Sequence, residues 1–310
     1  MPVSSTRRNL IKLFGSAFFL PFLNPTPASG KAETLHRKEI PASGEMLPVI
    51  GMGTWRTFNV GKDPKLRQAR TDVLSAFFAL GGRLIDCSPM YGSSSDTLGF
   101  SLKQIEVPDN LFAADKVWTG DGDATQEQVA TQLRKWGIAK FDLMQVHNLV
   151  EWRDHLATLT EMKRNGQIRY IGITTSHGRR HSELEQIMAE EKPDFIQLTY
   201  NITHRQAEQH LLPLAREKGI AVIANRPYDG GQLIRSLKQS QAVPEWAKAE
   251  IECQTWADFL LKFIVSHPAI TCAIPATTKV THLSENMQSG YGPLPNASQR
   301  LRMAKHIASI

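Results

Sequence analysis

Short apolar runs alternate with segments of helical period along most of this chain, and that alternation limits the folds open to it. The runs have the length and composition of β-strands, and most begin about 25 to 32 residues after the previous one. The eight predicted strands cover residues 48–52, 84–86, 111–116, 143–147, 170–173, 195–199, 221–225 and 271–275.

The segments between the strands have helical spacing. Apolar residues recur there every three or four positions, as in Val129, Leu133 and Trp136, which suits a helix packed on a sheet by one face. The predicted helices cover residues 65–80, 93–103, 125–136, 154–165, 181–191 and 206–218, with extra helices at 244–251 and 255–266 between the seventh and eighth strands. Eight strand–helix repeats predict an α/β fold, a (β/α)8 TIM barrel. Residues 37–40 and 46–49 flank a turn and predict an N-terminal hairpin that plugs the barrel floor.

The first thirty residues differ in composition from the rest. Arg7 and Arg8 precede an apolar stretch at residues 13–23 and a segment rich in Pro, Ala, Ser and Gly. This order is that of a twin-arginine export signal, with cleavage after Gly30 or Ala32. The apolar stretch is shorter than the ~20 residues that span a bilayer, so no stable membrane span is expected.

The sequence therefore predicts a signal peptide over residues 1–32 and a barrel domain over residues 33–310. It also predicts a periplasmic location, with the twin-arginine translocation machinery as a partner. The alternative is an uncleaved N-terminal anchor or a disordered arm.

The formal net charge of +6 comes partly from residues 1–32, which carry four cationic residues and no acidic one, so without them the charge is +2. No stripe of interleaved basic and aromatic residues argues for a nucleic-acid partner. The three cysteines, Cys87, Cys253 and Cys272, have no metal-ligand spacing, and no pair of strand histidines has a carboxylate partner. No metal site is expected.

Four chemically active residues lie at or just past the carboxyl ends of the second, third and fourth predicted strands. We call Asp86, Tyr91, Lys116 and His147 the strand-end tetrad. Each alone has an ordinary structural explanation: a turn cap, a packed ring, a solvated ammonium or a hydrogen-bonded core imidazole. A parallel barrel builds its active site at this edge, however, and neighbouring strand ends lie only ~5 to 10 Å apart. The joint placement indicates a catalytic site.

The tetrad has the composition of a proton donor with its supports. A free phenol has a pKa of about 10, so Tyr91 needs a nearby cation, which Lys116 supplies, to stabilise its phenolate. Asp86 would keep Lys116 protonated, and His147 can hydrogen-bond the carbonyl oxygen of a substrate. No side chain can supply the hydride that must accompany this proton, so the chemistry implies a nicotinamide cofactor.

Several ordered motifs resemble those of the aldo-keto reductases, from about Ile40 to Asn286. The motifs are residues 51–55 (GMGTW), Asp86 with 91–99 (YGSSSDTLG), Lys116, 142–147, 168–173 (IRYIGI) and 274–279 (IPATTK). The resemblance implies NADP-dependent reduction of a small aldehyde or ketone, with Tyr91 as general acid and the other three tetrad residues in support.

Matched position by position, the resemblance also implies a set of cofactor contacts. Thr174, Thr175 and Gln197 would hold the nicotinamide carboxamide, and Thr54 and Trp55 would lie near the ribose. The predicted phosphate contacts are Arg226, Thr277, Lys279 and Asn286.

Two positions depart from the family pattern. Asn225 stands where many members place an aromatic ring on the nicotinamide, with Tyr228 as an alternative stacking residue. His282 stands where an arginine often contacts the adenosine 2′-phosphate. The resemblance implies NADP as the cofactor, and these two departures leave NAD as the alternative.

Two other functions fit the same residues. One is a cofactor-binding or regulatory protein with little turnover. The other is a lyase in which Lys116 forms a Schiff base, which Asp86 disfavours because it raises the pKa of the lysine.

Overall fold

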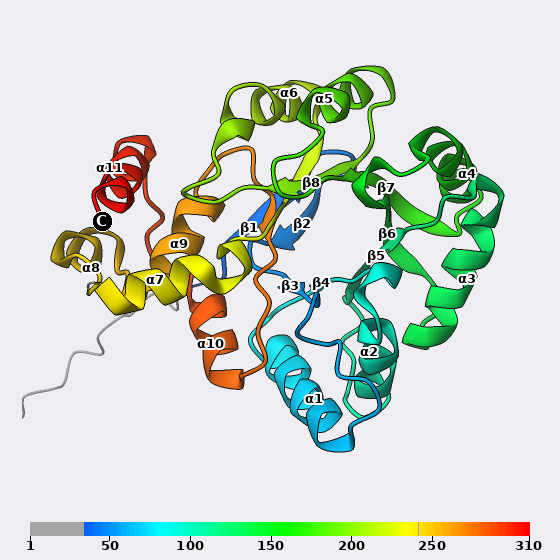
Figure 1. Cartoon of the computed structure of the whole chain (residues 1–310), viewed down its shortest axis with the longest axis horizontal. Helices are drawn as coiled ribbons and strands as arrows, with labels where there is room; N and C mark the ends of the chain where they lie inside the picture. Colours follow the sequence, from blue (N-terminus) through cyan, green and yellow to red (C-terminus); the bar gives the residue numbers. More distant parts are fainter. Residues whose placement is uncertain (1–33, 241) are drawn as a thin grey trace, which may run out of the picture. The chain divides into compact units, whose positions relative to one another are not determined.

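Eight parallel strands follow one another in chain order around a ring (Figure 1). The computed structural model describes residues 34–240 and 242–310. The strands are β3 Met52–Gly53, β4 Leu84–Asp86, β5 Phe112–Val117, β6 Phe141–Val146, β7 Ile168–Thr174, β8 Phe195–Thr199, β9 Ala221–Asn225 and β10 Cys272–Ala273. This is the parallel barrel that the strand–helix repeat predicts.

The ring closes between its first and last strands. Ile50 and Ala273 form a parallel bridge, in which Gly51 N donates to Ala273 O at 2.8 Å and Ala273 N donates to Val49 O at 2.9 Å. The predicted strand at residues 48–52 is therefore shorter than expected, because Pro48 already ends the hairpin and regular pairing resumes at Met52.

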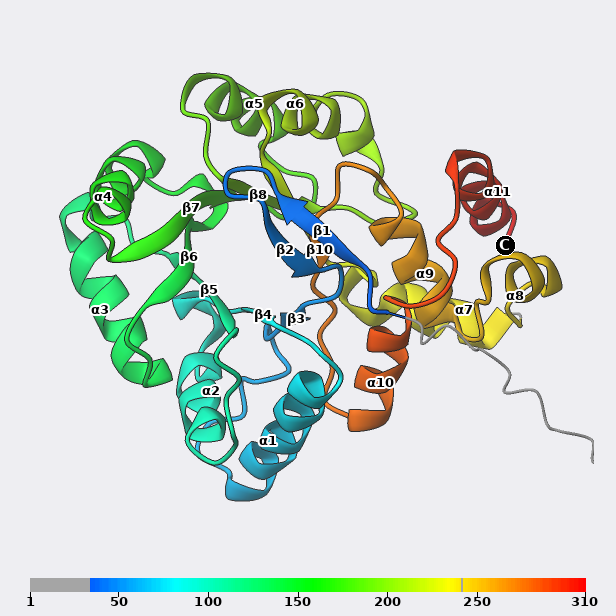
Figure 2. The same cartoon turned by 180° about the vertical axis from the view of Figure 1, so that it is seen from behind.

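The predicted hairpin is present and fills the barrel floor. Strands β1 Arg37–Ile40 and β2 Glu45–Pro48 pair antiparallel, and Figure 2 shows them across the ring from behind. Ile40 and Leu47 join one apolar cluster with inward-facing residues of the barrel strands, among them Phe112, Phe195 and Ile223. The floor is thus a packed core, as inward-facing apolar side chains of a barrel require.

Helices surround the strands (Figure 1). The helices are α1 Pro64–Ala79, α2 Ser94–Leu102, α3 Thr125–Trp136, α4 Trp152–Arg164, α5 His181–Glu190, α6 Leu211–Lys218, α7 Gln232–Ser240, α8 Glu245–Ile251, α9 Trp256–Val265, α10 Val280–Gln288 and α11 Ala297–Ala308. The predicted helix at 206–218 is instead a 3₁₀ turn, Gln206–Glu208, followed by α6. Pro213 explains the restart, since proline fits the first turn of a helix, where its missing N–H is not needed.

The predicted extra helices between β9 and β10 are α8 and α9, and α7 precedes them. Within residues 34–240 and 242–310, no helix has both the length and the apolar character needed to cross a membrane. The predicted signal peptide lies outside the described residues.

Candidate active site

Strand register brings the two charged members of the tetrad together. Asp86 ends β4 and pairs with Ala114 of β5, and Lys116, two residues further on, points to the same side of the sheet as Ala114. Lys116 Nζ donates to both carboxylate oxygens of Asp86, at 2.7 and 2.6 Å, and to Cys87 O at 2.7 Å. All three ammonium protons therefore have acceptors.

Two glutamines complete the hydrogen bonding of this buried pair. Gln197 Nε2 donates to Asp86 Oδ1 at 2.8 Å, and Gln145 Nε2 lies 3.3 Å from the same oxygen. Burial lowers the pKa of Lys116, but the charges of Asp86 and Tyr91 outweigh it and raise that pKa above its usual value. Lys116 is therefore a fixed cation, because a buried ion pair persists when further hydrogen bonds satisfy it.

Tyr91 ends a 3₁₀ turn, Pro89–Tyr91, directly after β4. Lys116 Nζ lies 5.2 Å from the centroid of its ring. Burial raises the pKa of the Tyr91 phenol above its ordinary value, and the Lys116 charge opposes that rise without cancelling it. The phenol thus stays protonated, and it gives its proton only to a strongly basic oxygen, such as an alkoxide.

His147 lies one residue past β6, at the start of a 3₁₀ turn, His147–Leu149, and not in the strand as expected. Its ring meets the Tyr91 ring edge-on, with 5.7 Å between centroids. Its Nδ1 lies 2.7 Å from Ser88 Oγ. Burial and the Lys116 charge lower the pKa of His147 to about 3, so the imidazole is neutral.

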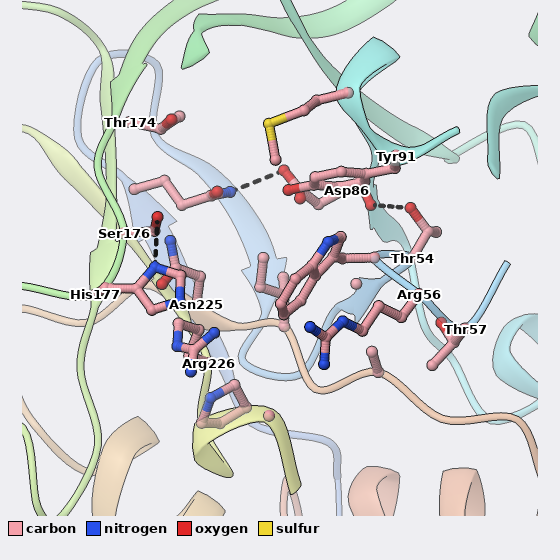
Figure 3. A pocket seen from close by; sticks show the side chains of 18 of the residues that line it. Thr54, Arg56, Thr57, Asp86, Tyr91, Thr174, Ser176, His177, Asn225 and Arg226 are labelled. Carbon is pink, nitrogen blue, oxygen red and sulfur yellow. Dashed lines mark hydrogen bonds between the residues drawn. The ribbon is translucent and has the colours of Figure 1, made fainter. Parts of the chain in front are cut away.

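A cavity of about 250 Å³ opens at the carboxyl ends of the strands (Figure 3). Figure 3 shows Asp86 and Tyr91 on one wall and Thr174, Ser176 and His177 on the opposite wall. Ten of the predicted site residues line it: Thr54, Trp55, Asp86, Tyr91, His147, Thr174, Thr175, Gln197, Asn225 and Arg226. Lys116 lies behind this lining, and Thr277, Lys279 and Asn286 are not part of it.

Asn225, which departs from the family pattern, is held in the cavity wall by two hydrogen bonds. Its Nδ2 donates to Thr175 O at 2.9 Å, and its Oδ1 accepts from Thr199 Oγ1 at 2.7 Å. Thr175 Oγ1 is buried and has no hydrogen-bond partner among the described residues. The wall therefore offers a free hydroxyl beside a fixed amide.

Two guanidinium groups face the cavity from opposite sides (Figure 3). The Arg56 guanidinium lies 4.2 Å from the Trp55 ring centroid, and that of Arg226 lies 5.8 Å from the same centroid. Arg226 also pairs with Asp229 at 2.7 Å. Two cations at one mouth suit an anionic ligand such as a phosphate.

The three predicted phosphate residues outside the cavity lie on or next to α10. Asn286 belongs to that helix, and its Oδ1 accepts from the Tyr228 hydroxyl at 2.6 Å. Tyr228 itself lines the cavity, so this hydrogen bond links the cavity wall to α10. Thr277 Oγ1 accepts from Lys279 N at 3.2 Å, which orders the entry to the helix.

Sequence reasoning missed Ser88, Gln145 and Arg56. Gln145 pairs in register with Lys116, so strand pairing would have found it. Ser88 lies two residues past Asp86, a position that no strand pattern marks. No cluster of three or more His, Cys, Asp or Glu side chains suited to a metal ion occurs in the described part of the chain.

The chain matches known proteins over most of the barrel. The profile of the aldo/keto reductase family matches residues 49–300. The chain is 27% identical over 260 residues to a methylglyoxal reductase, YeaE, of Escherichia coli, covering 81% of this chain and 89% of that protein. It is 28% identical over 243 residues to an NADH-specific methylglyoxal reductase of E. coli, covering 66% and 70%.

Solved structures share the fold. A Klebsiella pneumoniae aldo/keto reductase, solved in complex with NADP and acetate, superposes with a TM-score of 0.72 at 22% identity, covering 85% of this chain and 93% of that one.

Proposed function

Because this chain belongs to the aldo/keto reductase family, we propose that it reduces a small aldehyde or ketone in the cavity at the carboxyl end of its barrel, with Tyr91 as the proton donor. It is an NAD(P)H-dependent oxidoreductase. The observation that carries the assignment of Tyr91 is the buried Lys116–Asp86 pair, with Lys116 5.2 Å from the phenol ring centroid.

The cavity residues fit a nicotinamide dinucleotide. The unpartnered hydroxyl of Thr175 can bond the nicotinamide carboxamide, together with Thr174, and the guanidinium groups of Arg56 and Arg226 would hold phosphate oxygens. When bound, the reduced cofactor supplies the hydride.

The chain's own residues handle the proton. Tyr91 donates its phenolic proton to the substrate oxygen as negative charge develops there, and Lys116 stabilises the phenolate that remains. Neutral His147 contributes a hydrogen bond to the same oxygen, not a positive charge. Asp86 holds the ammonium in place.

The names of two relatives suggest which substrate to test first. Both are named methylglyoxal reductases, and a 2-oxoaldehyde is small enough for a cavity of about 250 Å³. We therefore propose a 2-oxoaldehyde as substrate, with NADPH and NADH compared as cofactors, since one relative is named NADH-specific.

The test is oxidation of reduced nicotinamide in the presence of methylglyoxal, by the wild-type protein and by Tyr91→Phe. We expect Tyr91→Phe to lower kcat by about 10² to 10⁴, because proton transfer is lost, with the nucleotide Kd unchanged. Turnover by Tyr91→Phe equal to that of the wild type would contradict the role of Tyr91. Tight nucleotide binding without turnover of any carbonyl compound would support a regulatory protein instead.

The lyase alternative is disfavoured by the surroundings of Lys116. A Schiff base needs a neutral amine, but Lys116 is fully buried, uses all three protons in hydrogen bonds and has a raised pKa. Lys116 also does not line the cavity.

We further propose that residues 1–32 direct the protein to the periplasm by the twin-arginine route. The proposal is supported by Arg7 and Arg8 ahead of the apolar stretch at 13–23. Residues 1–32 fused to a reporter should export it, and a lysine pair in place of the arginines should abolish export. Unimpaired export by the lysine-pair fusion would contradict the proposal.

A further inference from the structure

Ser88 is the hydroxyl residue that contacts the imidazole of His147. Its Oγ lies 2.7 Å from His147 Nδ1, and the serine is fully buried. Extended backbone at Ser88 and its place before the 3₁₀ turn fix this position, because its Oγ also accepts from Met90 N at 3.2 Å. Ser88 O in turn accepts from Tyr91 N at 2.9 Å. Ser88 thus contacts both His147 and Tyr91, which line the cavity.

The protons in this contact can be assigned by counting donors and acceptors. A serine hydroxyl has one proton and two lone pairs, and Met90 N–H already takes one lone pair. Within residues 34–240 and 242–310, His147 Nδ1 is the one acceptor recorded for the Ser88 proton. If Nδ1 carried a proton of its own, the buried hydroxyl proton would have no acceptor, which folded proteins avoid.

We propose that Ser88 is a positioning residue that donates to Nδ1 of His147 and so keeps the imidazole proton on Nε2. His147 is neutral, because burial and the Lys116 charge lower its pKa to about 3, so it carries a proton on one ring nitrogen. The proton on Nε2 makes that nitrogen a donor. The functional consequence rests on the proposed carbonyl reduction, in which His147 donates to the substrate oxygen.

Without the Ser88 hydroxyl, His147 Nδ1 loses the hydrogen bond that favours the proton on Nε2. With the proton on Nδ1, Nε2 would present a lone pair to the carbonyl oxygen and repel it. The hydride-accepting carbon would then lose polarisation, while the nucleotide contacts on the far wall stay intact. The expected signature is therefore a fall in kcat with an unchanged nucleotide Kd.

The direct test reads the tautomer without substrate or turnover. In protein labelled with ¹⁵N-histidine, long-range ¹H–¹⁵N spectra show which ring nitrogen carries the proton, and the His147 signals are identified by their loss in His147→Gln. We expect the proton on Nε2 in the wild type and in Ser88→Thr. In Ser88→Ala and Ser88→Val the fraction of His147 protonated on Nε2 should fall below that of the wild type, and an unchanged fraction would also overturn the proposal. A wild-type proton on Nδ1 overturns the proposal whatever the activity.

The kinetic test uses a matched pair of variants. The threonine and valine side chains have nearly the same shape, but only threonine has a hydroxyl. Ser88→Thr and Ser88→Val therefore differ in that group alone. We expect kcat to fall by about tenfold in Ser88→Val and Ser88→Ala and to stay near the wild-type value in Ser88→Thr. Equal losses in the threonine and valine variants would show that Ser88 acts through packing alone.

A second serine controls for the removal of a buried hydroxyl. Ser101 is fully buried and accepts from Thr71 Oγ1 at 2.9 Å, between α1 and α2. Ser101→Ala should leave both kcat and the His147 spectrum unchanged. If the wild type reduces no carbonyl compound, the proposed function fails, and the tautomer spectra still decide the role of Ser88.

Discussion

Adjacent residues of β5 serve opposite sides of the sheet. Lys116 meets Asp86 inside the barrel, whereas Asp115 accepts from Trp136 Nε1 of α3 at 2.9 Å and from Lys116 N at 2.7 Å. Both are fully buried. Burial, the largest effect, raises the pKa of Asp115 from 3.8 to about 7. One strand therefore carries a permanent cation and, next to it, a carboxyl group that titrates near neutrality.

Asp115 should make the stability of the protein depend on pH. The folded-state pKa of Asp115 is raised, so the protonated carboxyl group contributes to the free energy of unfolding below the unfolded-state pKa. This contribution is lost as the pH rises from about 4 to about 7. Asp115→Asn cannot titrate, so its free energy of unfolding should not show this decline. Denaturant unfolding of both proteins across this range measures it, and parallel curves would contradict the assignment.

For single residues, a place in the site can be predicted from the sequence when the side chain is chemically distinctive and the strand before it is recognisable. The four tetrad residues meet that condition, since each follows a clear apolar run. Ser88 and Arg56 do not, because their roles depend on turns after the strands: Ser88 on the 3₁₀ turn Pro89–Tyr91, and Arg56 on a left-handed backbone with φ 62°. Ser88 before Pro89 is a local turn signal, but it does not reveal that the serine hydroxyl meets His147, which lies 59 residues further along the chain.

Among the elements, the contact between α2 and α3 depends on one glycine. A Cβ at Gly99 would lie 1.8 Å from the backbone oxygen of Lys135, so the two helices approach closer than any side chain allows. Helix propensity alone favours alanine over glycine by about 1 kcal/mol. The clash is with backbone atoms, which cannot rotate away as a side chain can. We therefore expect the packing cost of Gly99→Ala to exceed the gain in helix propensity.

Gly99→Ala should therefore lower the free energy of unfolding by about 1–3 kcal/mol. Gly120→Ala is the matched control, since a Cβ there meets nothing within 4 Å. Denaturant unfolding of the two variants and the wild type measures the difference. A Gly99→Ala protein as stable as the control would mean that α2 and α3 can separate without cost.

The elements missed by sequence analysis lie after the regular repeat. Helices α7, α10 and α11 follow β9 or β10, where no further strand marks the register. For α11 a local signal exists: Asn296 and Gln299 form a capping box, with each side chain accepting from the backbone of the other. The core strands were recognisable because burial on both faces demands continuous apolar runs.

At the scale of the whole barrel, the Glu45 carboxylate connects the hairpin at the floor to the barrel wall. Glu45 accepts from Arg83 at 2.9 Å, from Arg169, and from the Tyr170 hydroxyl at 3.0 Å. It thereby joins the hairpin to residues next to β4 and in β7. Burial opposes the charge of Glu45, but these hydrogen bonds lower its pKa below the usual value.

Glu45→Gln should destabilise the barrel by about 1–2 kcal/mol at neutral pH. The lowered pKa means that the contribution of Glu45 is present above its unfolded pKa and is lost as the pH falls through the folded one, so the variant and wild type should converge in acid. Glu127→Gln is the control, because Glu127 pairs with Arg134 at an exposed site and should change nothing. Thermal unfolding at neutral and acidic pH measures both effects.

The hairpin plug also bears on the order in which the chain folds. Leu47 and Cys272 share the floor cluster, although 225 residues separate them in the sequence. The first strands of the domain to be synthesised therefore reach their final contacts only after the last barrel strand is made, and contacts of such long range form slowly. Until then Ile40 and Leu47 lack the part of their apolar cluster that Cys272 and Ile274 supply. Their burial marks the completed barrel.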